Sequence, residues 1–215
     1  MCSKCDCDAP SLFVEVAALV GVELSWSNTG KRSPTSLLYK DANAVPVMWV
    51  RASFHRPSPA QVYCCSFRGI VGTEWVPGRP SFLQGVFYGG RNLFLGIPEP
   101  YRRYETLRSE DGNAILATYR VSQWFGDFKD WHAEIIVNNN TYQMRHEHLP
   151  PRKRILYNGD KITVCDENRE VVTATVDRYN PERCRITVIR AVEGVEAVLA
   201  FLFMQARDMA IDDSD

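Results

Sequence analysis

The sequence lacks a hydrophobic run long enough to cross a bilayer. Its longest strictly apolar segment is Ala197–Met204, whereas a transmembrane helix needs about 20 apolar residues. The chain also lacks an excess of charge of either sign, because 25 Lys and Arg stand against 26 Asp and Glu, a net charge of −1. This balance excludes a general electrostatic attraction to nucleic acid, although it leaves room for a local basic patch. We expect a soluble, cytoplasmic protein with no nucleic-acid partner.

The N-terminus lacks the apolar segment of a secretory signal, because residues 1–10 read MCSKCDCDAP. Seven cysteines, an odd number, then indicate free thiols in a reducing compartment. Cys2, Cys5 and Cys7 have the spacing of metal ligands, but structural zinc takes four ligands and no histidine is near them in the sequence. We therefore expect residues 1–10 to be a mobile tail or a lipidation site rather than a metal centre.

Most of the chain is typical of short strands joined by turns. Runs of β-branched and aromatic residues alternate with Gly, Pro, Asn and Asp. The runs that predict strands include Ala60–Phe67, Phe82–Tyr88, Trp131–Val137, Val171–Val176 and Cys184–Arg190. A hairpin is predicted over 154–164, because Asn158-Gly159 favours the positive φ angles of a two-residue turn. Asn138–Asn140 is a weaker turn signal, and segment 11–26 fits a helix or a strand equally well.

One segment near the C-terminus determines the predicted architecture. Val195–Ala210 is rich in Ala and Leu, which favours a helix. No polar residue interrupts Ala197–Met204, so such a helix would be apolar on every side and must be enclosed. A mainly β chain can enclose it by closing into an antiparallel barrel; a helix held between a sheet and a dimer partner is the alternative. We predict one barrel domain over residues 11–211, followed by an acidic tail at 212–215.

Several motifs in the second half are similar to those of the tubby-like barrel superfamily. They are Phe125-Gly126, Trp131–Ile135, Arg152–Arg154, Val171–Arg178 and Gly194–Phe203. In order and spacing they resemble the closing strands and central helix of the LURP-one-related proteins, which have the phospholipid scramblases as relatives. The resemblance covers residues 104–211, whereas 57–100 departs from the family and leaves the strand count and the N-terminal layout open. It implies a closed antiparallel barrel around a hydrophobic C-terminal helix.

What the resemblance implies about function is a non-enzymatic binding or signalling module without a cofactor. Tubby proteins bind phosphoinositides at the membrane surface, scramblases are lipid-linked, and LURP-one proteins are associated with plant defence. The phosphoinositide-binding residues of the family cannot be assigned to positions of this chain. An alternative from another class is a scaffold that binds protein partners through an exposed barrel face, to which the five tryptophans could contribute.

The best binding motif in the sequence is a run of three cations, Arg152, Lys153 and Arg154. Arginine and lysine donate well to phosphate oxygens, and Arg145 could join the run across a turn. Each cation near an anionic membrane contributes about 1 kcal/mol. The run predicts a peripheral contact with phosphoinositide or other anionic lipid head groups, and a merely solvated run of charge is the alternative.

Two histidine motifs raise the alternative of a metal-dependent hydrolytic enzyme. His132-Ala-Glu134 matches the His-x-Glu of zinc deaminases, but the Pro-Cys-x-x-Cys that completes that signature is missing. His146 and His148 would lie on one side of a strand and could bind a metal together. No third ligand is evident from the sequence, so a solvated face is the favoured interpretation, with neither a metal site nor catalytic residues.

Overall fold

The computed structural model describes eight stretches of the chain. They are residues 9–28, 35–40, 45–52, 59–77, 101–122, 132–149, 159–177 and 184–211. Several predicted features lie outside them. These are Cys2, Cys5 and Cys7 of the N-terminal tail, the strand Phe82–Tyr88, the basic run Arg152–Arg154 and the acidic tail 212–215.

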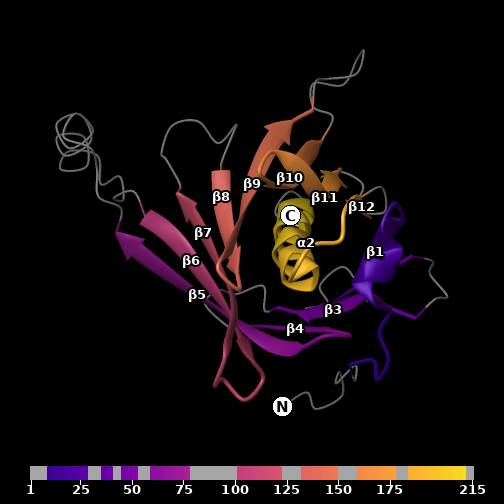
Figure 1. Cartoon of the computed structure of the whole chain (residues 1–215), viewed down its shortest axis with the longest axis horizontal. Coiled ribbons are helices and arrows are strands. Elements are labelled where there is room, and N and C mark those ends of the chain that lie inside the picture. Colours follow the sequence, from indigo (N-terminus) through magenta and orange to yellow (C-terminus); the bar gives the residue numbers. More distant parts are fainter. Residues whose placement is uncertain are drawn as a thin grey trace.

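Within the described stretches, twelve strands form a closed antiparallel barrel (Figure 1). They are β1 (Glu23–Asn28), β2 (Thr35–Tyr39), β3 (Met48–Arg51), β4 (Ala60–Cys64), β5 (Arg68–Pro77), β6 (Tyr101–Ser109), β7 (Ile115–Ser122), β8 (His132–Val137), β9 (Asn140–His148), β10 (Asp160–Asp166), β11 (Arg169–Val176) and β12 (Arg185–Val188). Each strand pairs with its neighbours in the chain, and β1 pairs with β12 through Glu23–Thr187 and Ser25–Arg185 to close the ring. Closure leaves no free sheet edge among these strands. The predictions of a mainly β fold and of a closed antiparallel barrel are confirmed.

Two of the hairpin turns contain non-glycine residues with positive φ angles. Asn138 and Asn139 join β8 to β9 with φ angles of 47° and 68°, so the predicted turn is confirmed. Glu167 and Asn168 join β10 to β11 in the same way, with φ of 46° and 68°. Asparagine tolerates this left-handed region better than other non-glycine residues, which is why it recurs at these positions.

The pairing of β10 differs from the hairpin predicted over 154–164, of which residues 154–158 lie outside the described stretches. Both edges of β10 are already paired, because Asp160 lies opposite His148 of β9 on one side and Val176 of β11 on the other. Gly159 therefore serves a different purpose: its φ is +119°, and a Cβ there would come within 2.4 Å of the Val176 carbonyl oxygen. The glycine is needed for a close backbone approach and not for a two-residue turn.

The segment that fitted helix or strand equally well contains both. A short 3-10 helix, η1 (Val16–Leu19), precedes β1. Val16 and Leu19 of η1 are buried in the barrel core. The ambiguous pattern therefore reflected two short elements in succession.

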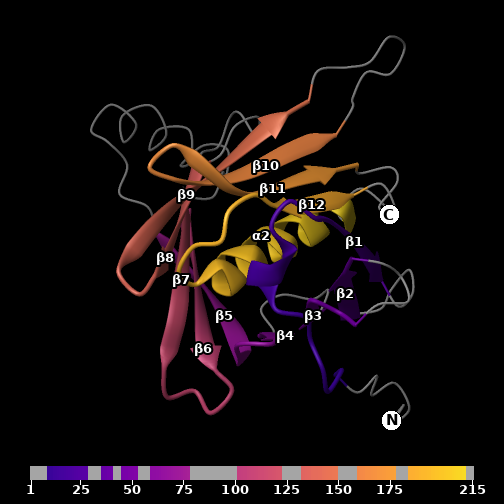
Figure 2. The ribbon, with the colours of Figure 1, turned by 45° about the vertical axis from the view of Figure 1, so that its right-hand side comes forward.

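The C-terminal helix α2 (Val195–Ile211) runs through the inside of the barrel (Figures 1 and 2). Every residue from Ala197 to Ala206 is buried. Phe201 stacks on Tyr119 of β7 and Phe203 packs edge-on against Trp26 of β1, with ring centroids 5.4 Å apart in both pairs. These two strands lie on opposite sides of the ring, because five strands separate them in either direction. The enclosed helix is confirmed, and the alternative of a helix held between a sheet and a dimer partner is wrong.

No helix in the described part of the chain has both the length and the apolarity that a membrane crossing requires.

Candidate functional site

Two histidines and one aspartate from neighbouring strands meet at one end of β9 and β10. His146 and His148 lie on β9 and point inward with Tyr142 and Met144, because side chains alternate along a strand. Asp160, the first residue of β10, is directly opposite His148 in the strand register. Its Oδ1 atom is 2.9 Å from His146 Nε2 and 2.7 Å from His148 Nδ1. We call these three residues the His-His-Asp cluster.

The cluster is closed on one side and accessible on the other. The side chains of Asp160 and His146 are 0% and 1% exposed, whereas that of His148 is 30% exposed. The two imidazole rings stand edge to face, with centroids 4.9 Å apart. A buried carboxylate is costly unless charged or hydrogen-bonding groups compensate it. Here His146 Nε2 shares a hydrogen bond with Asp160 Oδ1, and His148 Nδ1 lies 2.7 Å from the same oxygen.

The donor set of the cluster suits a divalent transition metal. One ligand atom from each residue can be chosen so that all three lie within 4.8 Å of one another. Imidazole nitrogen and carboxylate oxygen are ligands of zinc, iron, nickel and copper. In the described part of the chain, this is the one group of three His, Cys, Asp or Glu side chains close enough to share an ion. The same distances also fit a hydrogen-bonded network without metal, and a measurement of metal binding distinguishes the two.

The sequence identified only two members of the cluster. The favoured interpretation of His146 and His148, a solvated face, is wrong, because His146 is buried while Glu147 is exposed. Asp160 was missed because its position depends on the pairing of β9 with β10, across a connection from 149 to 159. The Asn158-Gly159 signal also paired Asp160 with residues 154–157 in the prediction, whereas Asp160 lies opposite His148 of β9. Knowing that β9 pairs with β10 in the register His148–Asp160 would have been enough to identify Asp160 as the third member of the cluster.

The other histidine motif lies on the outside of the barrel. His132 and Glu134 are exposed on β8, whereas Ala133 and Ile135 between and beyond them face the core. Glu134 accepts a hydrogen bond from the Gln143 side chain at 3.4 Å. Neither residue belongs to the His-His-Asp cluster. The geometry therefore gives His132 and Glu134 no metal-binding partners within the described stretches.

Of the predicted anion-binding residues, the structure describes Arg145 alone. Its side chain is exposed on β9, and the guanidinium donates to Asn168 Oδ1 at 3.3 Å. In the register its neighbours are His132 on one side and Thr163 on the other. Arg152, Lys153 and Arg154 belong to the connection between β9 and β10 and lie outside the described residues.

The tryptophans, which the sequence allowed on an interaction face or in the core, are buried where the structure describes their side chains. Trp26 packs against Phe203 of the central helix. Trp49 stacks on Tyr63, with ring centroids 4.8 Å apart, and is only 3% exposed. These two residues therefore give no support to a tryptophan-rich interaction face.

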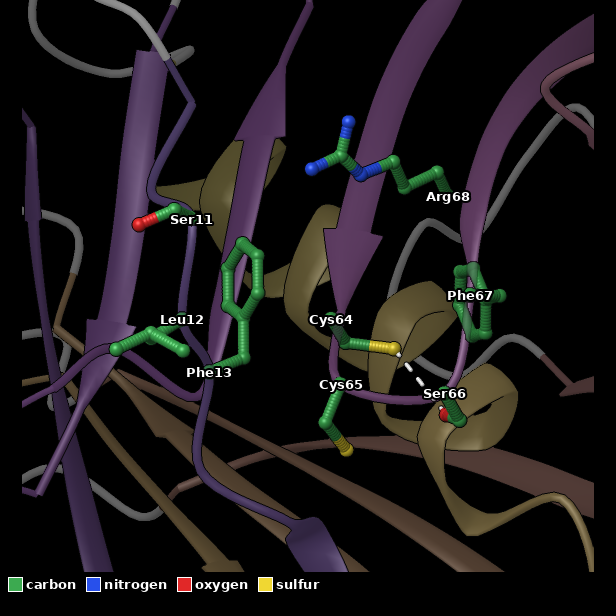
Figure 3. A pocket seen from close by; sticks show the side chains of 8 residues that line it. All are labelled: Ser11, Leu12, Phe13, Cys64, Cys65, Ser66, Phe67 and Arg68. Carbon is green, nitrogen blue, oxygen red and sulfur yellow. Dashed lines mark hydrogen bonds between the residues drawn. The ribbon is translucent and has the colours of Figure 1, made fainter.

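A surface pocket of about 370 Å³ lies away from the cluster, between residues 11–13 and 64–68 (Figure 3). The Sγ atom of Cys64 points toward Ser66 Oγ at 3.4 Å, whereas Cys65 is exposed. Burial raises the pKa of the Cys64 thiol, so the thiol stays protonated at neutral pH and is a poor nucleophile. The pocket therefore offers no activated thiol at Cys64.

Burial also raises the pKa of the Cys184 thiol, which lies outside this pocket, to about 11.

Comparisons of the chain with protein-family models, with curated proteins and with solved structures found no match. Membership of the tubby-like superfamily stays a prediction, based on the sequence motifs.

Proposed function

We propose that this protein is a metal-binding barrel and that the ion is held by His146, His148 and Asp160. The observation that carries the proposal is the convergence of two imidazole nitrogens on one buried carboxylate oxygen, at 2.9 and 2.7 Å. The pairing of β9 with β10 fixes the backbone positions of the three residues, so binding the ion requires little backbone movement. Rigid ligands on paired strands favour binding because little conformational freedom is lost.

The proposal agrees with a binding module and requires no catalytic step. A catalytic role would need a second group that handles protons or substrate, and Glu147 beside the two histidines points away from them to solvent. The expectation of a non-enzymatic, cytoplasmic module of the tubby-like kind stays a prediction. Metal binding would be an addition to it, since the resemblance implies no cofactor.

Purified protein is expected to bind one equivalent of Zn²⁺ or Co²⁺ with high affinity. His148→Gln and Asp160→Asn should each weaken binding by more than about 100-fold, because losing a direct ligand costs more than the 10–100-fold typical of residues that only orient ligands. Metal at 100 times its Kd should also stabilise the folded protein by about 2.7 kcal/mol. Isothermal titration measures the affinity, elemental analysis of the dialysed protein gives the stoichiometry, and urea denaturation with and without metal measures the stabilisation.

The matched control is His132→Gln, which removes an exposed imidazole from the adjacent strand β8. It should bind the ion like the parent protein. The cysteines of the tail are a competing set of ligands, so the same titration is run with Cys2, Cys5 and Cys7 replaced by serine. Equal affinity in the parent, His148→Gln and Asp160→Asn proteins would overturn the proposal.

We also propose the anionic-lipid contact that the basic run predicts. Arg152–Arg154 belong to the connection that begins after His148 and ends before Asp160, and Leu149 N donates to Gly159 O at 2.9 Å where its two ends meet. The chain thus carries three cations within a few residues of the cluster. This placement follows from the sequence and the bounds of β9 and β10.

Sedimentation with vesicles tests the lipid contact. Phosphatidylcholine vesicles containing a phosphoinositide should pellet the parent protein more than vesicles of phosphatidylcholine alone. Replacing Arg152, Lys153 and Arg154 with alanine should remove most of that difference, and added salt should reduce it, because surface charges are screened. If both proteins pelleted equally with both kinds of vesicle, the lipid proposal would be contradicted and the metal-site proposal would not be affected.

A further inference from the structure

We infer that the ion in the His-His-Asp cluster keeps open coordination positions and takes an anionic oxygen ligand, a phosphate or a carboxylate, from solution. This inference rests on the proposed metal site and names the ligand of that site. Three features of the described residues carry it: the number of protein ligands, the charge of the loaded site, and the side from which the site is accessible.

The number of protein ligands leaves positions of the ion open. Within the described part of the chain the cluster supplies three ligand atoms, one each from His146, His148 and Asp160. A zinc ion takes at least four ligands, so at least one position remains for a ligand from solution.

The charge of the loaded site favours an anion in those positions. A divalent ion with two neutral imidazoles and one carboxylate carries a net charge of +1. Asp160 and His146 are buried, so water screens this charge only on the side of His148. A buried net charge is costly, and an anionic ligand neutralises it. Phosphate and carboxylate oxygens are also hard donors that suit the remaining positions of such an ion.

Access to the site is possible from one direction. Met144 and Ile162 are the next inward residues along β9 and β10, and both are 0% exposed. They close the site on the side toward the middle of the barrel. His148 is the partly exposed ligand, and it lies at the last residue of β9. A ligand from solution would therefore arrive beside His148.

Cobalt spectroscopy tests the inference, with the tail cysteines replaced by serine so that thiolate ligation does not contribute. Co²⁺ should bind and give a visible absorption spectrum. Inorganic phosphate and acetate should each change that spectrum in a saturable way, whereas neutral acetamide should not. His132→Gln should behave like the parent in every titration. His148→Gln should bind cobalt more weakly, which the shift of its titration midpoint would measure.

The outcomes separate the two proposals. Failure to bind Co²⁺ would overturn the proposed metal site. Binding with a visible spectrum that neither phosphate nor acetate alters would leave the metal site standing and overturn the inference. A spectrum that acetamide changes as strongly as phosphate would also contradict it, because the choice of an anion would be lost.

Discussion

Leu202→Asp is expected to abolish folded, soluble protein. Leu202 lies in the middle of α2 and is 0% exposed, with barrel strands on every side of the helix. The substitution removes a core side chain, which alone costs about 2.7–5 kcal/mol for Leu→Ala, and it places a carboxylate where no water can solvate it. Domains are stable by only about 5–15 kcal/mol. The soluble fraction after expression and the far-ultraviolet circular dichroism of any soluble material measure the effect.

The matched control is Ile115→Asp, which introduces the same charge at a position 58% exposed on β7. Its effect on the free energy of unfolding should stay within about 0.5 kcal/mol, as is usual for surface positions. A Leu202→Asp protein as soluble and as stable as the Ile115→Asp protein would show that the helix is not enclosed.

Gly159→Ala is expected to destabilise the barrel by about 3 kcal/mol or more. The φ of +119° is a conformation that side chains rarely adopt, and such strain costs about 1–3 kcal/mol. The added Cβ would also come within 2.4 Å of the Val176 carbonyl oxygen, so β11 or the start of β10 has to move. Because Asp160 follows directly, metal affinity should fall as well. Urea denaturation with and without metal measures both effects.

Gly72→Ala is the control for this change. Gly72 lies on β5 with no atom within 4 Å of the added Cβ and no positive φ. Alanine there should leave the urea midpoint unchanged or raise it slightly, because it restricts the unfolded chain. If both variants unfolded at the same urea concentration, the claim that the backbone of Gly159 packs closely against β11 would be contradicted.

The enclosed helix could be predicted because its signal is local. Ala197–Met204 contains no polar residue, and burial on every side follows from helical geometry whatever the rest of the chain does. The turn at Asn138 could likewise be predicted, because asparagine adopts positive φ angles more easily than most residues. Barrel closure was the favoured way for a chain of short strands to surround a helix, with a dimer partner as the alternative.

The cluster could not be predicted because it depends on a long-range register. Alternation along β9 placed His146 and His148 on one side but did not say which side faces the core. Asp160 joins them through a pairing across residues 149–159, and the strong Asn-Gly turn signal in that segment pointed to a different hairpin. The glycine was required by its contact with Val176, which only the folded arrangement contains.

X-ray absorption spectroscopy of the metal-loaded protein tests the central claim most directly. The chain contains seven cysteines as well as the His-His-Asp cluster, and sulfur ligands lie about 2.3 Å from zinc whereas nitrogen and oxygen lie at about 2.0–2.2 Å. We predict a shell of nitrogen and oxygen alone, with the outer scattering of two imidazole rings, which falls to one ring in His148→Gln. A sulfur shell in the parent protein, or a spectrum that His148→Gln leaves unchanged, would contradict the assignment of the metal to His146, His148 and Asp160.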